Sequence, residues 1–194
     1  MKSTIFYSIF LSVALLCGNA QALDLPKADL SSPILKTIDA RKSTRNFSSK
    51  PVSEQLLSNI LWAAFGTNTH NTRTIPTAMN QQNLKVFVVY NNAVWQYDGK
   101  ANTLNKIEAL DVMPFIAKQD FVKDAPLQLI YAGDKKFADA HSGSAYENVS
   151  LYIAEQGLAS VVRGSIDRKA LHKALNLADD EIATFNQVIG YPTE

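Results

Sequence analysis

The chain has 194 residues, of which 46% are hydrophobic and 19% are charged, and its formal net charge is +1. These values are typical of one globular domain with an apolar core. The near-neutral balance gives no support for binding to nucleic acid or to an anionic membrane, because such partners are usually met by an excess of Lys and Arg.

The first 22 residues have the pattern of a secretory signal. Lys2 precedes the apolar stretch IFYSIFLSVALLC, and AQA, which ends at Ala22, is a small-x-small cleavage site. The apolar stretch is shorter than the ~20 residues that span a bilayer, which favours cleavage over a retained anchor. We therefore expect a signal peptide at 1–22, a single domain at 23–194 with no membrane span, and export, to the periplasm in a Gram-negative cell.

Removal of 22 residues from 194 leaves 172, without Lys2 and without Cys17, which is the only cysteine. The mature chain then carries 18 basic and 18 acidic residues. A chain without thiols suits an oxidising compartment, and it excludes disulfides, Cys-ligated zinc and thiol nucleophiles.

The first half of the domain predicts two helices and a set of hairpin strands. The segment SSPILKTIDARKS has Ser and Pro at helix-start positions, and SEQLLSNILWAAFG has Ser53 as a helix cap and Gly66 as a stop. The β-branched and aromatic stretch LKVFVVY predicts a strand. A hairpin follows through NNA into VWQYDGKANTL, with a second turn at Asp98 and Gly99.

The second half alternates strands and helices without a regular repeat. LQLIYAG predicts a strand after Pro126, residues 137–156 have helical spacing up to Gly157, and ASVVRGS predicts a short strand. Asp167 is expected to cap another helix, and FNQVIGYP is expected to form the last strand. This order predicts an α+β fold with a mixed β-sheet flanked by helices.

Several kinds of chemistry are disfavoured. The three histidines, His70, His141 and His172, lack the i, i+4 spacing of paired metal ligands, so no metal site is predicted. HSGSA places serines beside His141, but adjacent helix residues point apart and the Gly-x-Ser-x-Gly elbow of hydrolases is absent. Since glycine-rich phosphate loops are also absent, side-chain cations would have to hold any phosphate.

Two polar segments are candidates for such a site. DARKSTRNF places Arg41, Lys42 and Arg45 around Ser43, where the first helix gives way to a loop. The planar guanidinium of Arg and the hydroxyl of Ser suit a phosphate. The alternative is that the three cations only form a solvated helix end, where they favour the helix dipole. RTIPTAMNQQ, from residue 73 to residue 82, is stiffened by Pro76 and rich in hydrogen-bonding side chains, which is typical of an ordered loop that holds a ligand.

Together these segments resemble the nitroreductase family of FMN-dependent oxidoreductases, in particular its small SagB-like members. The first segment matches Arg-basic-Ser-x-Arg-x-Phe, and the second matches Pro-Ser/Thr-Ala-x-Asn-x-Gln about thirty residues later. GLASVVRGSID resembles the family's Gly-Leu-x-Ser-Val segment, and VIGYP resembles its closing strand. The resemblance extends over nearly all of residues 23–194.

The resemblance implies a homodimer with FMN at its interface. The flavin phosphate and ribityl chain would be bound by Arg41, Lys42, Ser43 and Arg45. The ring would be covered by the partner subunit's copy of the loop, through Pro76, Thr77, Ala78, Asn80 and Gln82. The backbone of Arg163, Gly164 and Ser165 would lie along the ring's reactive edge, where an amide N–H near N5 favours the reduced form.

Some of these assignments have structural alternatives. Asn80 and Gln82 could instead satisfy the backbone of their own loop, and Arg163 could be a structural ion-pair partner. Asn148 matches a position that usually supports packing. Many members of the family carry basic residues after the final strand, whereas this chain ends in YPTE, so phosphate binding would depend on the cations near residue 43, with Arg73 as a further candidate.

The expected function is ping-pong transfer of two electrons from a small-molecule donor to an electron-poor acceptor, such as a nitro compound or a quinone. No side chain is expected to act as a catalytic acid or base. Export would separate the protein from cytosolic nicotinamides, which favours another electron donor. The alternatives are a SagB-like flavin dehydrogenase acting on a peptide or small metabolite, and a flavin-binding protein without turnover.

Overall fold

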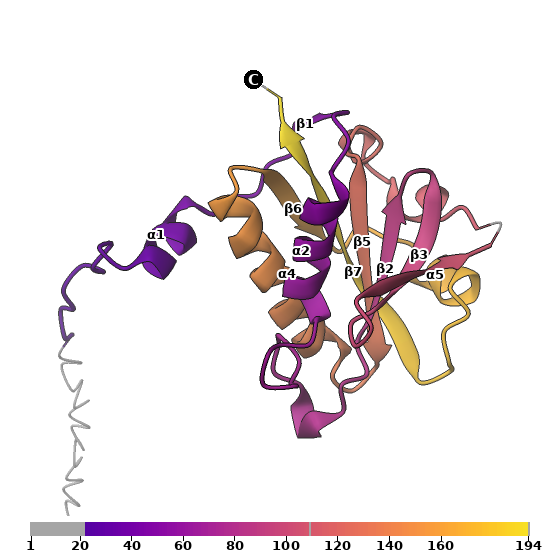
Figure 1. The fold of residues 1–194 in the computed structure, drawn as a ribbon, viewed down its shortest axis with the longest axis horizontal. Coiled ribbons are helices and arrows are strands. Elements are labelled where there is room, and N and C mark those ends of the chain that lie inside the picture. Colours follow the sequence, from indigo (N-terminus) through magenta and orange to yellow (C-terminus); the bar gives the residue numbers. More distant parts are fainter. Residues whose placement is uncertain (1–21, 109, 194) are drawn as a thin grey trace, which may run out of the picture.

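The computed structural model describes residues 22–108 and 110–193, which form one β-sheet with helices on both faces (Figure 1). The predicted signal peptide lies outside the described residues except for Ala22, so it stays a prediction. Within the described ranges, no helix has the length and apolar character needed to cross a bilayer.

The predicted elements occur in the expected order, and a short helix at Met113–Ile116 and a two-residue strand at Phe47–Ser48 are additions that the sequence patterns did not predict. The helices are α1 (Pro33–Ala40), α2 (Glu54–Phe65), α3 (Met113–Ile116), α4 (Ala138–Glu155) and α5 (Arg168–Ala174). The strands are β1 (Phe47–Ser48), β2 (Lys85–Tyr90), β3 (Ala93–Asp98), β4 (Thr103–Ile107), β5 (Leu127–Asp134), β6 (Ala159–Arg163) and β7 (Glu181–Pro192). Short 3₁₀ turns occur at Ala78–Asn80 (η1) and Asp120–Val122 (η2).

Local sequence signals account for the helix ends. The Ser53 hydroxyl accepts a hydrogen bond from the Leu56 N–H at 3.3 Å and so caps α2, as expected. The Asp167 carboxylate accepts from the Ala170 N–H at 3.0 Å and caps α5 in the same way. At the end of α4, Gly157 adopts a φ of +65°, a left-handed conformation that glycine enters without the steric cost of a Cβ.

The sheet order is β1-β7-β5-β2-β3-β4, with β6 also paired to β7. Every pairing among the described strands is antiparallel, so the expectation of a mixed sheet is wrong, while the α+β class is confirmed. The connection through α4 does join two strands of the same direction, β5 and β6. However, β7 lies between them and runs opposite to both, so the two never pair.

The two sheet faces bury different sets of side chains, as the alternation along each strand requires. Toward α2 and α4, Val86, Val88, Leu129 and Tyr131 pack in one core cluster that includes Ile60. Toward α3 and α5, residues of the opposite parity form a second core, which includes Phe87, Ile130, Ala132 and Leu171. The helices on the first face, α2 and α4, position the candidate site.

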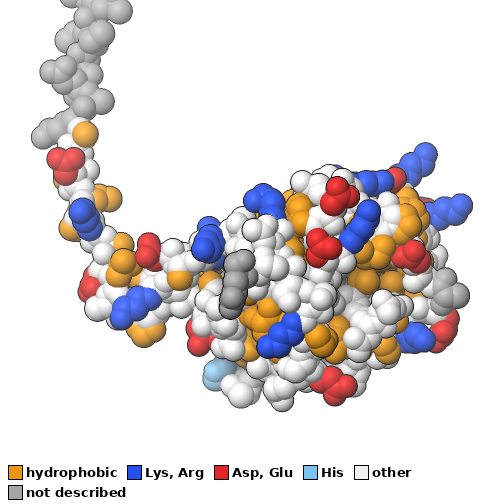
Figure 2. Space-filling model, turned by 90° about the horizontal axis from the view of Figure 1, so that it is seen from above, with side chains coloured by type: hydrophobic (Ala, Val, Ile, Leu, Met, Phe, Trp, Pro, Cys, Tyr) orange, Lys and Arg blue, Asp and Glu red, His pale blue; other side chains and the backbone are white. Residues whose placement is uncertain are grey.

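The N-terminal segment and α1 project from the body of the molecule (Figure 2). Helix α1 lies beside α4, but none of its residues is buried. Ile34 and Ile38, on its predicted apolar face, are 54% and 47% exposed. The helix itself is confirmed, yet the single chain leaves its apolar face uncovered.

Two glycines provide a test of the packing beside α2. A Cβ at Gly99 would lie 2.1 Å from the Phe65 carbonyl oxygen, whereas a Cβ at Gly143 in α4 would meet no heavy atom closer than 3.8 Å. We expect Gly99→Ala to lower the free energy of unfolding by about 1 to 3 kcal/mol, because backbone must move. Gly143→Ala, the control, should raise it by about 0.5 to 1 kcal/mol through helix propensity. Urea denaturation measures both, and equal effects would contradict the close approach.

Candidate functional site

The basic segment at residues 41–45 leaves α1 and runs along β6. The Thr44 N–H donates to the Ser160 carbonyl oxygen at 2.9 Å, which fixes the segment to the strand. Arg41, Lys42 and Arg45 are all exposed to solvent, and Arg41 and Lys42 lie beside α4.

This segment forms one wall of a cavity of about 270 Å³. The other walls come from α4 and β6, and the complete lining is Arg41, Lys42, Ser43, Tyr146, Glu147, Ser150, Ser160, Val161 and Val162. An adjoining cavity of about 380 Å³ shares Lys42, Ser150 and Ser160 with the first. We call the pair the basic cavity, and its size is in the range of small-molecule sites, roughly 300 to 1,000 Å³.

The charges around the basic cavity favour an anion. Arg41 Nε lies 3.8 Å from a carboxylate oxygen of Glu147, and the two side chains are 40% and 49% exposed. A solvated contact of this kind contributes little energy, so a bound anion can replace Glu147 as the partner of Arg41. Lys42 and Ser43 add a second cation and a hydroxyl donor, which are groups that bind phosphate oxygens.

The second predicted segment, which we call the 73–82 loop, is anchored to both helices of the same face. The Asn148 amide donates to the Ala63 carbonyl at 3.2 Å and to the Thr74 carbonyl at 3.1 Å. The Thr74 hydroxyl donates to the Trp62 carbonyl at 2.9 Å, and Ile75 is buried. Asn148 thus ties the start of the loop to α2 and α4, in agreement with its expected packing role.

The middle of the 73–82 loop is held by a histidine of α4. The Ala78 N–H donates to His141 Nε2 at 2.8 Å, and His141 is only 3% exposed. Beyond Ala78, the backbone is left-handed at Met79, Asn80 and Gln82, with φ values of 52°, 55° and 45°. Residues other than glycine seldom adopt this backbone conformation, so the surrounding structure must impose it on the loop.

The polar side chains of the loop mostly bond to one another. Arg73 Nε donates to Gln82 Oε1 at 3.2 Å, and Gln82 Nε2 donates to Asn80 Oδ1 at 2.8 Å. The Arg73 guanidinium also donates to the Phe65 carbonyl and lies 4.4 Å from the centre of the Phe65 ring. Arg73 does not line the basic cavity, so the expectation that it adds to phosphate binding there finds no support in this chain.

Arg163 is buried inside the protein and is 5% exposed. It donates to Gln119 Oε1, the Ile116 carbonyl and Asn186 Oδ1 at 2.8 to 2.9 Å, and to the Ser165 carbonyl at 3.0 Å. Burial lowers the pKa of Arg163 below its ordinary value. Its side chain therefore has a structural role with neutral partners rather than in an ion pair, and only its backbone remains a candidate for contact with a flavin.

The structure brings together only part of the predicted site. Arg41, Lys42 and Ser43 line the basic cavity, while Arg45 is exposed nearby in sequence and does not line it. Gly164 and Ser165 are exposed just beyond the end of β6. Neither part of the basic cavity is lined by the predicted residues of the 73–82 loop, which are Pro76, Thr77, Ala78, Asn80 and Gln82.

Sequence reasoning missed the contribution of α4. Tyr146, Glu147 and Ser150 line the basic cavity from one side of this helix. Ser150 lies four residues after Tyr146 and three after Glu147, and this helical spacing is the signal that could have placed them together. The sequence around His141 shows the pattern of neither a metal ligand nor a hydrolase residue, and no local pattern indicates its bond to a loop 63 residues away.

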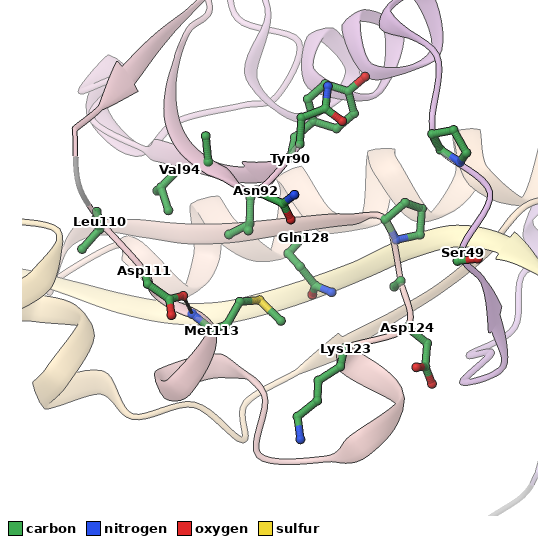
Figure 3. Close-up of a pocket in the computed structure, with 16 residues that line it drawn as sticks. Ser49, Tyr90, Asn92, Val94, Leu110, Asp111, Met113, Lys123, Asp124 and Gln128 are labelled. Carbon is green, nitrogen blue, oxygen red and sulfur yellow. Dashed lines mark hydrogen bonds between the residues drawn. The ribbon is translucent and has the colours of Figure 1, made fainter.

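A different cavity, of about 560 Å³, lies between the β2–β3 turn and the segment before β5 (Figure 3). Gln128 points into it from β5, and Asp111, Lys123 and Asp124 lie around it. It is larger than either part of the basic cavity taken alone, but it contains neither predicted segment and its charges are of mixed sign. The described residues also contain no group of three His, Cys, Asp or Glu side chains that could hold a metal ion.

The fold and the matched residues define the class of protein. The Nitroreductase family model matches residues 38–191, so the chain belongs to the nitroreductase family and is an oxidoreductase by that membership. The match includes both the basic segment and the 73–82 loop.

Two proteins named as nitroreductases are similar over most of their lengths. One, from Ralstonia eutropha JMP134, has a crystal structure that matches with a TM-score of 0.76 and 32% identity, over 88% of this chain and 89% of that chain. The other, MJ1384 of Methanocaldococcus jannaschii, is 26% identical over 82% of this chain and 90% of its own length. A protein of Clostridium acetobutylicum named as an NADH oxidase has the same fold, with a TM-score of 0.61 and 24% identity, over 81% of this chain and 88% of that chain.

The buried guanidinium of Arg163 generates a stability prediction. Arg163→Met should lower the free energy of unfolding by about 2 to 4 kcal/mol, because the Asn186 side chain and the Ile116 carbonyl lose a charged donor inside the protein. The control is Lys169→Met, which removes an exposed cation of α5 and should change stability by less than about 0.5 kcal/mol. Equal stabilities in chemical denaturation would show that Arg163 does not support the fold.

Proposed function

We propose that this protein is an FMN-dependent oxidoreductase that transfers two electrons, in a ping-pong cycle, to an electron-poor acceptor such as a nitro compound or a quinone. The observation that carries the proposal is the basic cavity, where Arg41, Lys42 and Ser43 face Tyr146 and Ser150 across a site of suitable size. Membership of the nitroreductase family supports it.

The donor set fits the phosphate end of FMN. Arg41 offers a planar fork, Lys42 a point charge and Ser43 a hydroxyl, while Glu147 can give up its solvated contact with Arg41. The Ser160 and Val162 positions of β6 line the same cavity and lead to the exposed backbone of Gly164 and Ser165. A ribityl chain extending along β6 would therefore reach the segment expected beside the flavin ring.

The chain's own residues bind and orient in this proposal, and none has to move a proton. When bound, FMN would supply the two-electron chemistry, accepting reducing equivalents from a donor and passing them to an acceptor. The cations near Ser43 would anchor the phosphate, and the backbone near Gly164 would orient the ring edge. The 73–82 loop would exclude water from the ring's open side.

We propose that the 73–82 loop covers the flavin of the partner subunit across a homodimer interface. The 73–82 loop lines neither part of the basic cavity of its own chain, and its tip is exposed, with Met79 78% accessible. The uncovered apolar face of α1 lies on the same side of the sheet, beside α4. A second copy would thus complete the site with its own loop and cover these apolar side chains.

The phosphate anchor is tested by changing the charge at one position. Arg41→Ala should weaken FMN binding by about ten- to a hundredfold, since a charge-assisted contact contributes roughly 1.5 to 3 kcal/mol. Glu147→Gln should tighten binding, because it removes the carboxylate that competes for Arg41. Titration of apoprotein, followed by flavin fluorescence, measures both affinities.

Lys106→Ala, which removes an exposed cation of β4, is the matched control and should leave the affinity unchanged. Unchanged affinity in Arg41→Ala would show that the basic cavity is not the phosphate site. An equal loss in Lys106→Ala would indicate a general charge effect.

The shared site is tested by mixing two damaged chains. Arg41→Ala removes the anchor, and Asn80→Ala alters the loop. A heterodimer of the two variants would contain one intact site and one doubly damaged site if the loop acts across the interface. Mixed subunits should then bind up to about half the FMN of the unmodified protein, with its affinity. Binding no better than either variant alone, in dimers shown by differential tagging to have exchanged subunits, would place the loop over its own chain's site.

A further inference from the structure

His141 is a buried histidine with a defined protonation state. Nε2 accepts the Ala78 N–H at 2.8 Å, so this nitrogen carries no proton and the neutral ring must hold its proton on Nδ1. The ring packs against Phe137, with centroids 5.9 Å apart and an interplanar angle of 28°. The bond is therefore made only by neutral histidine, held in a fixed orientation.

The bond lies where the 73–82 loop enters its strained section. Ala78 immediately precedes Met79 and Asn80, both left-handed, and Met79 is 78% exposed. Upstream, Thr74 is fixed by Asn148 and the Trp62 carbonyl, but those contacts lie four residues before Ala78. His141 is thus the side chain of α4 that holds the loop at its turn.

We propose that His141 is the positioning residue of the flavin-covering loop and that protonation of its ring releases the loop, which makes flavin retention depend on pH. The inference deepens the function proposed above and rests on it only for the identity of the bound flavin. A cationic ring would present an N–H to the Ala78 N–H, so the hydrogen bond would be replaced by repulsion. The strained turn would then lose the contact that fixes its first residue.

The charged groups around His141 set the direction of the effect. Burial lowers the pKa of His141 below its ordinary value, and the opposing influence of Asp134, at the end of β5, is smaller. Lys136 Nζ lies 5.0 Å from the centre of the Phe137 ring, and Asp139 of α4 is exposed to solvent. Because the folded pKa is lowered, the contact is complete above about pH 6.5, the ordinary value for His, and is lost as the pH falls through the lower pKa of the folded protein.

The test compares the unmodified protein with His141→Gln and His141→Phe between pH 8 and pH 5. Gln offers a carbonyl acceptor that does not titrate, whereas Phe keeps the packing on Phe137 but accepts nothing. From pH 8 to pH 5, the FMN dissociation constant of the unmodified protein should rise about three- to tenfold more than that of His141→Gln, the range of one ordinary hydrogen bond. His141→Phe should bind FMN weakly at every pH. Titration of the FMN phosphate itself would change the affinity of all three proteins alike.

A second readout needs no flavin. Amide hydrogen exchange of residues 77–82 in apoprotein should accelerate at low pH in the unmodified protein relative to His141→Gln at the same pH, while α2 stays protected. His172→Gln on α5 is the matched control and should behave as the unmodified protein, and circular dichroism at each pH checks that all variants remain folded.

The outcomes separate the two proposals. Absence of FMN binding at pH 8, with the expected exchange pattern, would overturn the proposed function and leave the loop contact standing. FMN binding at pH 8 with the same pH dependence in the unmodified protein and His141→Gln would overturn the role of His141. Identical exchange of residues 77–82 in both proteins at pH 5 would overturn it as well.

Discussion

Packing of α4 against the sheet is the constraint on which the candidate site depends. Val149 and Ile153 bury one side of this helix in the core shared with α2 and the sheet. The rest of its surface then has a fixed direction: Tyr146 and Ser150 line the basic cavity, and His141 reaches the 73–82 loop. Because both halves of the site use one rigid helix, a shift of α4 would move them together.

The central strand β7 adds a polar interior beneath this helix. Tyr131 donates its hydroxyl to Gln187 Oε1 at 2.6 Å, and the Gln187 amide reaches Ser150 Oγ at 3.2 Å. On the opposite face, Asn186 bonds to Arg163. Buried polar groups of this kind are costly unless every partner is placed correctly, so these bonds select one register of β7 and one placement of α4.

Most of the helices and strands follow from local chemistry, although α3 was not predicted. Ser53 and Asp167 cap helices as expected, and Gly157 ends α4. The start of β7 was missed, because the residues at 181–184 carry weak strand signals and become a strand by pairing with β5. The mixed sheet was wrong for a related reason: the sequence shows which segments are strands, but pairing is decided by which edges meet during packing.

The amino-acid sequence by itself determined the family motif, the α+β class and the clustering of Arg41 and Lys42 near Ser43, because these are properties of neighbouring residues. Only the tertiary structure decided which residues meet. It enclosed Arg163 among neutral acceptors, turned Arg73 toward Phe65 and placed Ala78 against His141. Such contacts depend on how helices and strands distant in sequence pack on one sheet, and no local spacing records that geometry.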